Sequence, residues 1–321
     1  MGSNQFVLTC FLAIAVAARV QAADTFDSEK PAPDEEGTFN FNLENDEIAG
    51  TDRHYTNGVE FSYLSSPLER NSNWRFGVAI GHQLFTPQDT DTTLPQPADQ
   101  PYAGYLYGGL ALVVDHGSQL DTFVVNLGTI GPDAHGEELQ NDVHRLIDSD
   151  RSNGWANQLD NEITYQGIYE HRWRGVLQTK GGFLGADLSP HLGASVGNVA
   201  GYANAGLTFR FGNDLRDDYG VPRIRPSLPG SGFFTPKDGF GWYAFAGVDG
   251  RYVWQNIFLD GNSDGNSLSV DKKRWVYDVQ AGLALTFRRV RFAYTYVYRS
   301  KEFETQTAND RFGAVSISAR F

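Results

Sequence analysis

The fold is decided by residues 39–63, which open on Phe39-Asn40-Phe41-Asn42-Leu43-Glu44 and close on Gly58-Val59-Glu60-Phe61-Ser62-Tyr63. In both halves, apolar side chains alternate with polar or small ones, which is the period of a β-strand with one apolar face. A polar connection joins the halves, so the stretch predicts a β-hairpin. The end of this hairpin holds Asn45, Asp46, Asp52, His54 and Thr56. Such residues suit ordinary turn chemistry, and they also suit the binding of a cation or of a water molecule.

The same alternation recurs along the chain in runs of the length that a membrane-spanning strand needs, about 9–11 residues. Residues 274–288 show it best, because Trp275, Tyr277, Leu283 and Leu285 share one face, which we predict to contact lipid. We predict about twelve strands, an even number as in bacterial membrane barrels. They lie near 38–46, 55–66, 73–85, 103–115, 119–131, 161–173, 183–198, 200–212, 240–256, 274–288, 289–300 and 309–321. Residues 213–239 depart from this scheme, because they are long and rich in Pro and Gly where a short turn is expected.

The first residues predict export. Residues 1–22 have the apolar run and the small residues of a signal peptide that is cleaved after Ala22, and residues 23–37 form a flexible leader. The chain's single cysteine, Cys10, lies too early in the apolar run for a lipoprotein signal. The mature protein then has no cysteine, which excludes disulfides, a thiol nucleophile and a thiolate zinc site. A net charge of −13 argues against nucleic acid as a partner.

The last strand ends on Phe321 after apolar alternation, which resembles the C-terminal signal that the barrel assembly machinery of bacteria recognises. An ordinary soluble strand is the alternative. Together with the signal peptide, this end favours an all-β transmembrane antiparallel β-barrel over residues 38–321, placed in the bacterial outer membrane. Lipids of that membrane are then expected partners.

One segment has a helical period. Residues 137–147 place Leu139, Val143, Leu146 and Ile147 on one stripe, and Gln140 and His144 share a face at i and i+4. If both termini are periplasmic, this short helix and the hairpin end both lie in extracellular connections. We therefore predict an active site that combines Asn45, Asp46 and Thr56 with Gln140 and His144. A surface histidine without a catalytic role is the alternative for His144.

At these residues, the sequence resembles the outer-membrane lipid A 3′-O-deacylase family (LpxR-type). The matching pieces are Asn45-Asp46, Tyr55-Thr56-Asn57-Gly58, Pro101-Tyr102-Ala103-Gly104 and the long run from Gly128 to Glu162. The resemblance implies a twelve-stranded barrel and Ca²⁺-dependent removal of the 3′-linked acyloxyacyl group from lipid A, the lipid of lipopolysaccharide. It also implies that Asn45, Asp46, Thr56, Gln140 and His144 are the catalytic set. The loop between Phe85 and Pro101 departs from the basic character of some relatives, because it carries Asp89, Asp91 and Asp99.

The residue types fit ester hydrolysis. His144 can take a proton from water as a general base, with Gln140 or a carboxylate orienting its ring. Oxygens of Asp46, Asn45 and Thr56 are ligands that Ca²⁺ prefers, and a bound cation polarises an ester carbonyl. The sequence has no Gly-x-Ser-x-Gly elbow, so it does not support that serine-hydrolase architecture. Two other functions remain open: a channel or adhesin without chemistry, and a different outer-membrane lipid hydrolase with a Ser-His pair.

Overall fold

The computed structural model describes residues 36–50, 53–69, 72–147, 151–181, 183–215 and 218–321. The predicted signal peptide (1–22) and nearly all of the leader (23–37) lie outside the described residues, as does Asp52. Within the described part of the chain, every helix is too short or too polar to cross a membrane.

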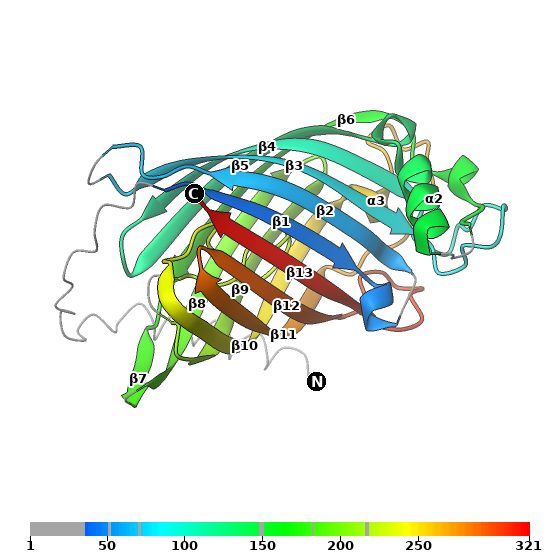
Figure 1. The fold of residues 1–321 in the computed structure, drawn as a ribbon. Helices are drawn as coiled ribbons and strands as arrows, with labels where there is room; N and C mark the ends of the chain where they lie inside the picture. The colour runs from blue at the N-terminus through cyan, green and yellow to red at the C-terminus, as the bar shows by residue number, and fades with distance from the viewer. Residues whose placement is uncertain (1–35, 51–52, 70–71, 148–150, 182, 216–217) are drawn as a thin grey trace.

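Thirteen strands in the described residues form one antiparallel sheet, and twelve of them close it into a barrel (Figure 1). The strands are β1 (Thr38–Asn45), β2 (His54–Leu64), β3 (Trp74–Thr86), β4 (Ala103–Asp115), β5 (Gln119–Ile130), β6 (Glu162–Trp173), β7 (Leu177–Gly181), β8 (Leu184–Gly197), β9 (Ala200–Gly212), β10 (Lys237–Asn256), β11 (Trp275–Arg288), β12 (Val290–Arg299) and β13 (Asp310–Arg320). Neighbours in sequence pair with each other except β6 and β7, β1 pairs with β13, and β6 pairs with β8 to complete the ring. The predicted barrel is therefore confirmed.

The predicted strands differ from the observed ones mainly at two places. β7 was not predicted, because its five residues pair only with the start of β8 and lie outside the ring. β10 begins at Lys237, earlier than the predicted residue 240, and its register with β11 shifts between Lys237 and Phe240.

The alternation of side chains sets the two faces of the wall. In β11, Trp275 and Tyr277 are exposed on the outside, whereas Val276 and Asp278 between them are buried toward the lumen. Leu283 is likewise exposed and Leu285 half-buried on the outer face, which agrees with the predicted lipid-facing set. The lumen face carries charged side chains in pairs, which a barrel interior tolerates because each charge meets a partner.

The first described residues and the C-terminal Phe321 lie at one end of the barrel, where the amide of Gly37 donates to the carbonyl of Phe321 at 3.1 Å. We call this the terminal end, which we predict to be periplasmic, and we call the opposite end the rim. The connections at the rim contain the short helices η1 (Glu47–Ala49), η2 (Pro132–Ala134), α2 (Gly136–Ile147), η3 (Trp155–Asn157) and α3 (Ile257–Asp260). Figure 1 shows α2 and the β1–β2 hairpin at this same end.

The long connection between β9 and β10 fills the lumen, where a short turn was expected. We call its residues 218–236 the plug. Arg223 donates from Nε to Glu44 of β1 at 3.0 Å and from Nη1 to Gln280 of β11 at 2.7 Å. Arg225 forms an ion pair of 2.6 Å with Glu170 of β6. The plug therefore contacts the wall on several sides, and its Pro- and Gly-rich sequence allows an irregular path without strand pairing.

The rim end of the lumen is filled by aromatic side chains. Phe258 of α3 stacks on Phe85 of β3, with ring centroids 3.7 Å apart. Tyr55 and Phe312 pack beside them in the same buried cluster. At the terminal end, the hydroxyl of Tyr219 of the plug donates to the carbonyl of Gly117 at 2.7 Å, so described residues occupy the lumen at both ends.

Candidate active site

The hairpin end brings three of the predicted site residues together. Asn45 is the last residue of β1, and the amide of Asp46 donates to the carbonyl of Thr56 at 3.3 Å. The register of β2 against β3 shifts between Tyr55 and Asn57, so Thr56 sits in a β-bulge. A bulge re-aims a side chain, and here the Thr56 hydroxyl lies 2.7 Å from that of Thr86 on β3. The side chains of Asp46 and Thr56 are buried.

The predicted helix is confirmed as α2, and it packs on β3 and β4. The contact is close because both sides present glycine. A Cβ added to Gly104 on β4 would lie 3.0 Å from the Cα of Gly136, the first residue of α2. A side chain at either position would push the helix from the wall.

The helix covers the outer face of the wall, on the side that faces lipid. Leu84 and Ile80 point outward from the same strand, yet Ile80 is 56% exposed and Leu84 only 2%. The difference arises because Leu84 is covered by Tyr102, Trp155 and Leu139 of α2. Asn45 belongs to the outward set of β1, which also contains the exposed Phe39. The candidate residues therefore gather on the outside of the barrel at the rim.

Gln140 lies inside this contact between helix and wall. Its Oε1 accepts a hydrogen bond of 2.7 Å from Nε1 of Trp155, and its side chain is 2% exposed. Nε2 of Gln140 is buried and has no hydrogen-bond partner among the described residues. His144 lies one turn further along α2, but its side chain falls outside the described part of the structure. The orientation of His144 by Gln140 stays a prediction.

The two groups of predicted residues are linked through β3. Thr56 contacts Thr86 at the end of this strand, and Leu84 of the same strand contacts Trp155, the partner of Gln140. The hairpin residues and Gln140 are therefore held on the same part of the outer wall.

His82 lies beside the candidate site, although the sequence pattern did not single it out. It takes the outward position of β3 after Val78 and Ile80. Its Nε2 donates to the carbonyl of Ala134, which precedes α2, at 2.7 Å. Its buried Nδ1 has no partner among the described residues and is left as an acceptor. A polar side chain in an otherwise apolar outward row was the signal available in the sequence.

The hairpin oxygens fit a hard cation of irregular geometry better than a transition metal. Across the described ranges, three or more His, Cys, Asp and Glu side chains nowhere gather as a metal cluster. The hairpin instead offers the carboxylate of Asp46, the amide of Asn45 and the hydroxyl of Thr56, which are oxygen ligands suited to Ca²⁺. With a single carboxylate, such a site needs water, backbone or substrate oxygens to complete six to eight ligands.

His54, the other histidine of the hairpin, is buried in a polar cluster. Its Nδ1 lies 2.8 Å from Asp310 and its Nε2 lies 3.2 Å from Asp99. Burial opposes ionisation of Asp99, yet hydrogen bonds from His54 and from the amide of Gln88 lower its pKa below the ordinary value. Because both ring nitrogens are engaged, His54 has no free nitrogen to act as a general base.

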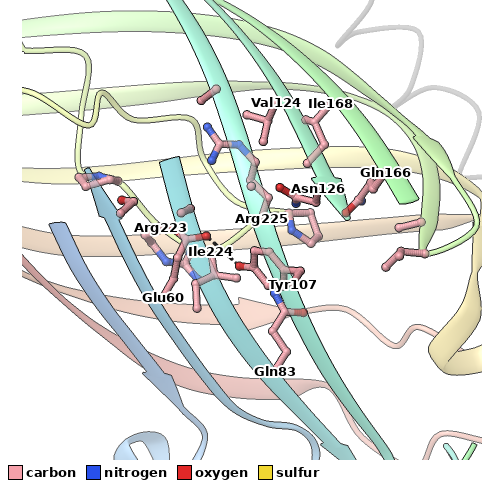
Figure 2. A pocket seen from close by; sticks show the side chains of 18 of the residues that line it. Glu60, Gln83, Tyr107, Val124, Asn126, Gln166, Ile168, Arg223, Ile224 and Arg225 are labelled. Atoms are coloured by element: carbon pink, nitrogen blue, oxygen red, sulfur yellow. Dashed lines mark hydrogen bonds between the residues drawn. The ribbon is translucent and has the colours of Figure 1, made fainter. Parts of the chain in front are cut away.

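A cavity lies elsewhere, inside the lumen. It has a volume of about 170 Å³ and lies between the plug and the wall (Figure 2). Figure 2 shows Arg223, Ile224 and Arg225 facing Glu60 and Tyr107, whose hydroxyl donates to the Glu60 carboxylate at 2.7 Å. The residues that line the cavity include none of the five predicted catalytic residues. The residues predicted to be catalytic therefore lie apart from this cavity.

The chain matches the family model described as "Outer membrane protein LpxR" over residues 6–321. Among solved structures, it is similar to LpxR from Salmonella typhimurium, with a TM-score of 0.74 and 22% identity over 88% of this chain and 99% of that chain. It also matches the beta domain of the Bordetella autotransporter Brka, with a TM-score of 0.47 and 10% identity over 89% of this chain and 99% of that chain. The comparison with curated proteins found no match. The Salmonella structure supports the barrel fold.

Proposed function

We propose that this chain, which belongs to the LpxR family of outer membrane proteins, is an esterase that removes the 3′-linked acyloxyacyl group from lipid A. The observation that carries the proposal is the position of α2 on the outer face of the wall, where it buries Leu84 and Gln140. A site on that face meets lipids that diffuse in the membrane, whereas a lumen site meets solutes. An ester of a membrane lipid is the substrate class that this placement favours.

The chemistry assigned to the chain is hydrolysis by an activated water. His144 takes a proton from water as the oxygen of that water bonds to the ester carbonyl carbon. The bond between this carbon and the 3′ oxygen then breaks, and the proton on His144 passes to the leaving 3′ oxygen. The products are the free acyloxyacyl acid and a lipid A with a 3′ hydroxyl. Nε2 of Gln140 is a donor without a described partner, available to the ring of His144 or to the substrate.

The hairpin residues supply the other half of the site. Asp46, Asn45 and Thr56 are the residues that would hold Ca²⁺. A bound Ca²⁺ supplies Lewis-acid stabilisation of the negative charge that develops on the carbonyl oxygen. The bulge at Thr56 and the hydrogen bond between Asp46 and Thr56 hold these ligands near one another before substrate arrives.

The test is hydrolysis by the purified, folded protein in detergent. With lipid A and Ca²⁺, mass spectrometry should detect release of the acyloxyacyl acid, and excess EDTA should stop it. Asp46→Ala should lack activity at Ca²⁺ concentrations that saturate the wild type. Activity that persists in EDTA, or an Asp46→Ala enzyme with wild-type turnover, contradicts the metal role. Inactivation by a serine-directed reagent would instead favour the Ser-His lipid hydrolase.

A channel is the alternative that the lumen argues against. The plug and the aromatic cluster around Phe258 occupy both ends of the lumen. We expect the wild type to show no stable conductance steps in planar bilayers. Reproducible single-channel currents from the purified protein would favour the channel.

A further inference from the structure

The histidine at the hairpin, His54, joins three connections of the rim. It is the first residue of β2, Asp99 lies in the connection between β3 and β4, and Asp310 begins β13. Each ring nitrogen faces one carboxylate, so the ring bridges Asp99 and Asp310. The edge of the ring also packs on Phe303, with centroids 5.2 Å apart.

The two connections that hold His54 are themselves joined. The Thr305 hydroxyl donates to the carbonyl of Ala98 at 2.6 Å, and the Thr307 hydroxyl donates to Oε1 of Gln88 at 2.8 Å. Nε2 of Gln306 donates to the second oxygen of Asp310 at 2.9 Å. The anchor of His54 is therefore a connected network and not a single surface pair, which makes its geometry specific.

His54 also has an unusual backbone. Its φ angle is +62°, in the left-handed region that bulky residues rarely adopt. Such a conformation persists where the surroundings fix it, and these residues concentrate at functional sites. Because the ring of His54 is fixed, it also fixes the backbone direction at the preceding residue, Arg53.

That preceding peptide reaches the predicted metal ligand. The amide of Arg53 donates to Oδ2 of Asp46 at 2.5 Å, across the connection between β1 and β2. The Arg53 side chain also forms an ion pair that fixes this residue, because its Nε lies 3.4 Å from a carboxylate oxygen of Asp310. The position of the Asp46 carboxylate thus depends on the residue that His54 holds in place.

We propose that His54 is a positioning residue that orients Asp46 toward a bound divalent cation, through the amide of Arg53. The inference rests on the proposed function, because that function assigns Asp46 to a Ca²⁺ site. Groups that orient a metal ligand without touching the metal change metal affinity by roughly 10–100-fold when they are removed. His54 is then part of the hairpin's metal chemistry without being a catalytic residue.

The test measures Ca²⁺ affinity directly, by isothermal titration calorimetry on the folded full-length protein in detergent. His54→Gln keeps a polar side chain but loses the two ring nitrogens that bridge Asp99 and Asp310. We expect its Kd for Ca²⁺ to rise by roughly 10–100-fold. Lipid A turnover should return close to the wild-type rate once Ca²⁺ is saturating, since the catalytic groups are intact. His116→Gln, a half-exposed histidine at the terminal end, is the matched control and should bind Ca²⁺ as the wild type does.

The outcomes separate this inference from the proposed function. A wild type that hydrolyses lipid A, together with a His54→Gln variant of unchanged Kd, overturns the positioning role and leaves the function standing. Weaker Ca²⁺ binding by His54→Gln, in a protein that does not hydrolyse lipid A, supports the positioning role and refutes the function. A wild type that binds no Ca²⁺ overturns the inference. If His54→Gln does not fold, Asp99→Asn decides, because it replaces one of the two carboxylates that hold the ring and should weaken Ca²⁺ binding.

Discussion

The plug and the rim site are both built from connections between strands, but the two regions differ in the partners and the location of their buried polar groups. In the plug, Asp218 lies 3.1 Å from Arg291 of the wall, and Tyr219 donates to Asp115 at 2.6 Å. At the rim, Nε2 of Gln140 and Nδ1 of His82 are buried without a partner in the described residues. The carboxylates of the plug are thus paired with groups of the wall. The unpartnered groups of the rim lie on the outer wall, whereas those around the plug, such as Nε2 of Gln280 and Nε of Arg291, face the lumen.

This difference indicates where the molecule is stabilised and where it acts. A buried polar group without a partner costs stability, and at the rim such groups belong to or lie beside the predicted catalytic residues on the outer wall. The plug closes the lumen with paired charges, and the rim keeps an incomplete set of hydrogen bonds on the lipid-facing wall. Variants of the plug should therefore change stability, and variants of the rim should change turnover.

The largest expected effect is on turnover at the rim. His144→Asn should lower the rate of acyloxyacyl release by roughly 10²–10⁴-fold, because a general base is lost. The barrel should still fold, since Asn is tolerated in a helix, and heat-modifiable migration on gels checks this. His135→Asn, a highly exposed histidine at the same rim, is the control. A folded His144→Asn protein with wild-type turnover would remove His144 from the mechanism.

The next effect is on stability at the plug. Asp218→Asn leaves Arg291 and Arg210 without the carboxylate they share, and a broken buried pair costs about 3–5 kcal/mol. Urea unfolding in lipid vesicles should show this loss, while turnover of the folded fraction stays near that of the wild type. Asp264→Asn, in an exposed loop, should change neither property. If Asp218→Asn lost turnover but kept its stability, the plug would have the role that we assign to the rim.

The assignment of faces can be tested on β11. Leu283→Arg places a charge on the lipid-facing side and should lower the free energy of unfolding by roughly 2–4 kcal/mol if it lies near the midplane. Leu94→Arg, in the exposed β3–β4 connection, should leave folding yield unchanged. Wild-type stability of Leu283→Arg in lipid would mean that the outer face is wrongly assigned.

The smallest effect concerns the contact between α2 and the wall. Gly104→Val inserts carbon atoms where the backbone of Gly136 lies 3.0 Å from a Cβ, and overpacking typically costs about 1–3 kcal/mol. The strain should displace α2 and lower turnover, with the barrel still folded. Gly108→Val is on the same strand, where an added Cβ would meet only the carbonyl oxygen of Ala79 at 4.0 Å, so it should retain activity. Equal activity of the two variants would show that the position of α2 does not affect the active site.

The strands and α2 could be predicted because each repeats a simple period. Residues 274–288 alternate strictly, and the apolar stripe from Leu139 to Ile147 has a helical spacing, so both emerged close to their observed bounds. The plug has no period, since its side chains meet an irregular lumen on several sides. Neither its burial nor the pair between Arg223 and Glu44 can be predicted from the local pattern.

The candidate site was predictable in part for the same reason. Asn45, Asp46 and Thr56 are close in sequence, so a hairpin brings them together. The partners of His54 could not be predicted, because Asp99 and Asp310 lie 45 and 256 residues away. Asp99 was interpreted only as a departure from a basic loop, whereas the structure gives it a role in holding His54.

The most direct test of the account is the mass of lipid A extracted from cells that express the wild type or His144→Asn at equal levels in the outer membrane. The account predicts that the wild type converts lipid A to a species lighter by one acyloxyacyl group, and that His144→Asn leaves lipid A unchanged. Unmodified lipid A in cells that carry the folded wild type, with Ca²⁺ supplied, would contradict it.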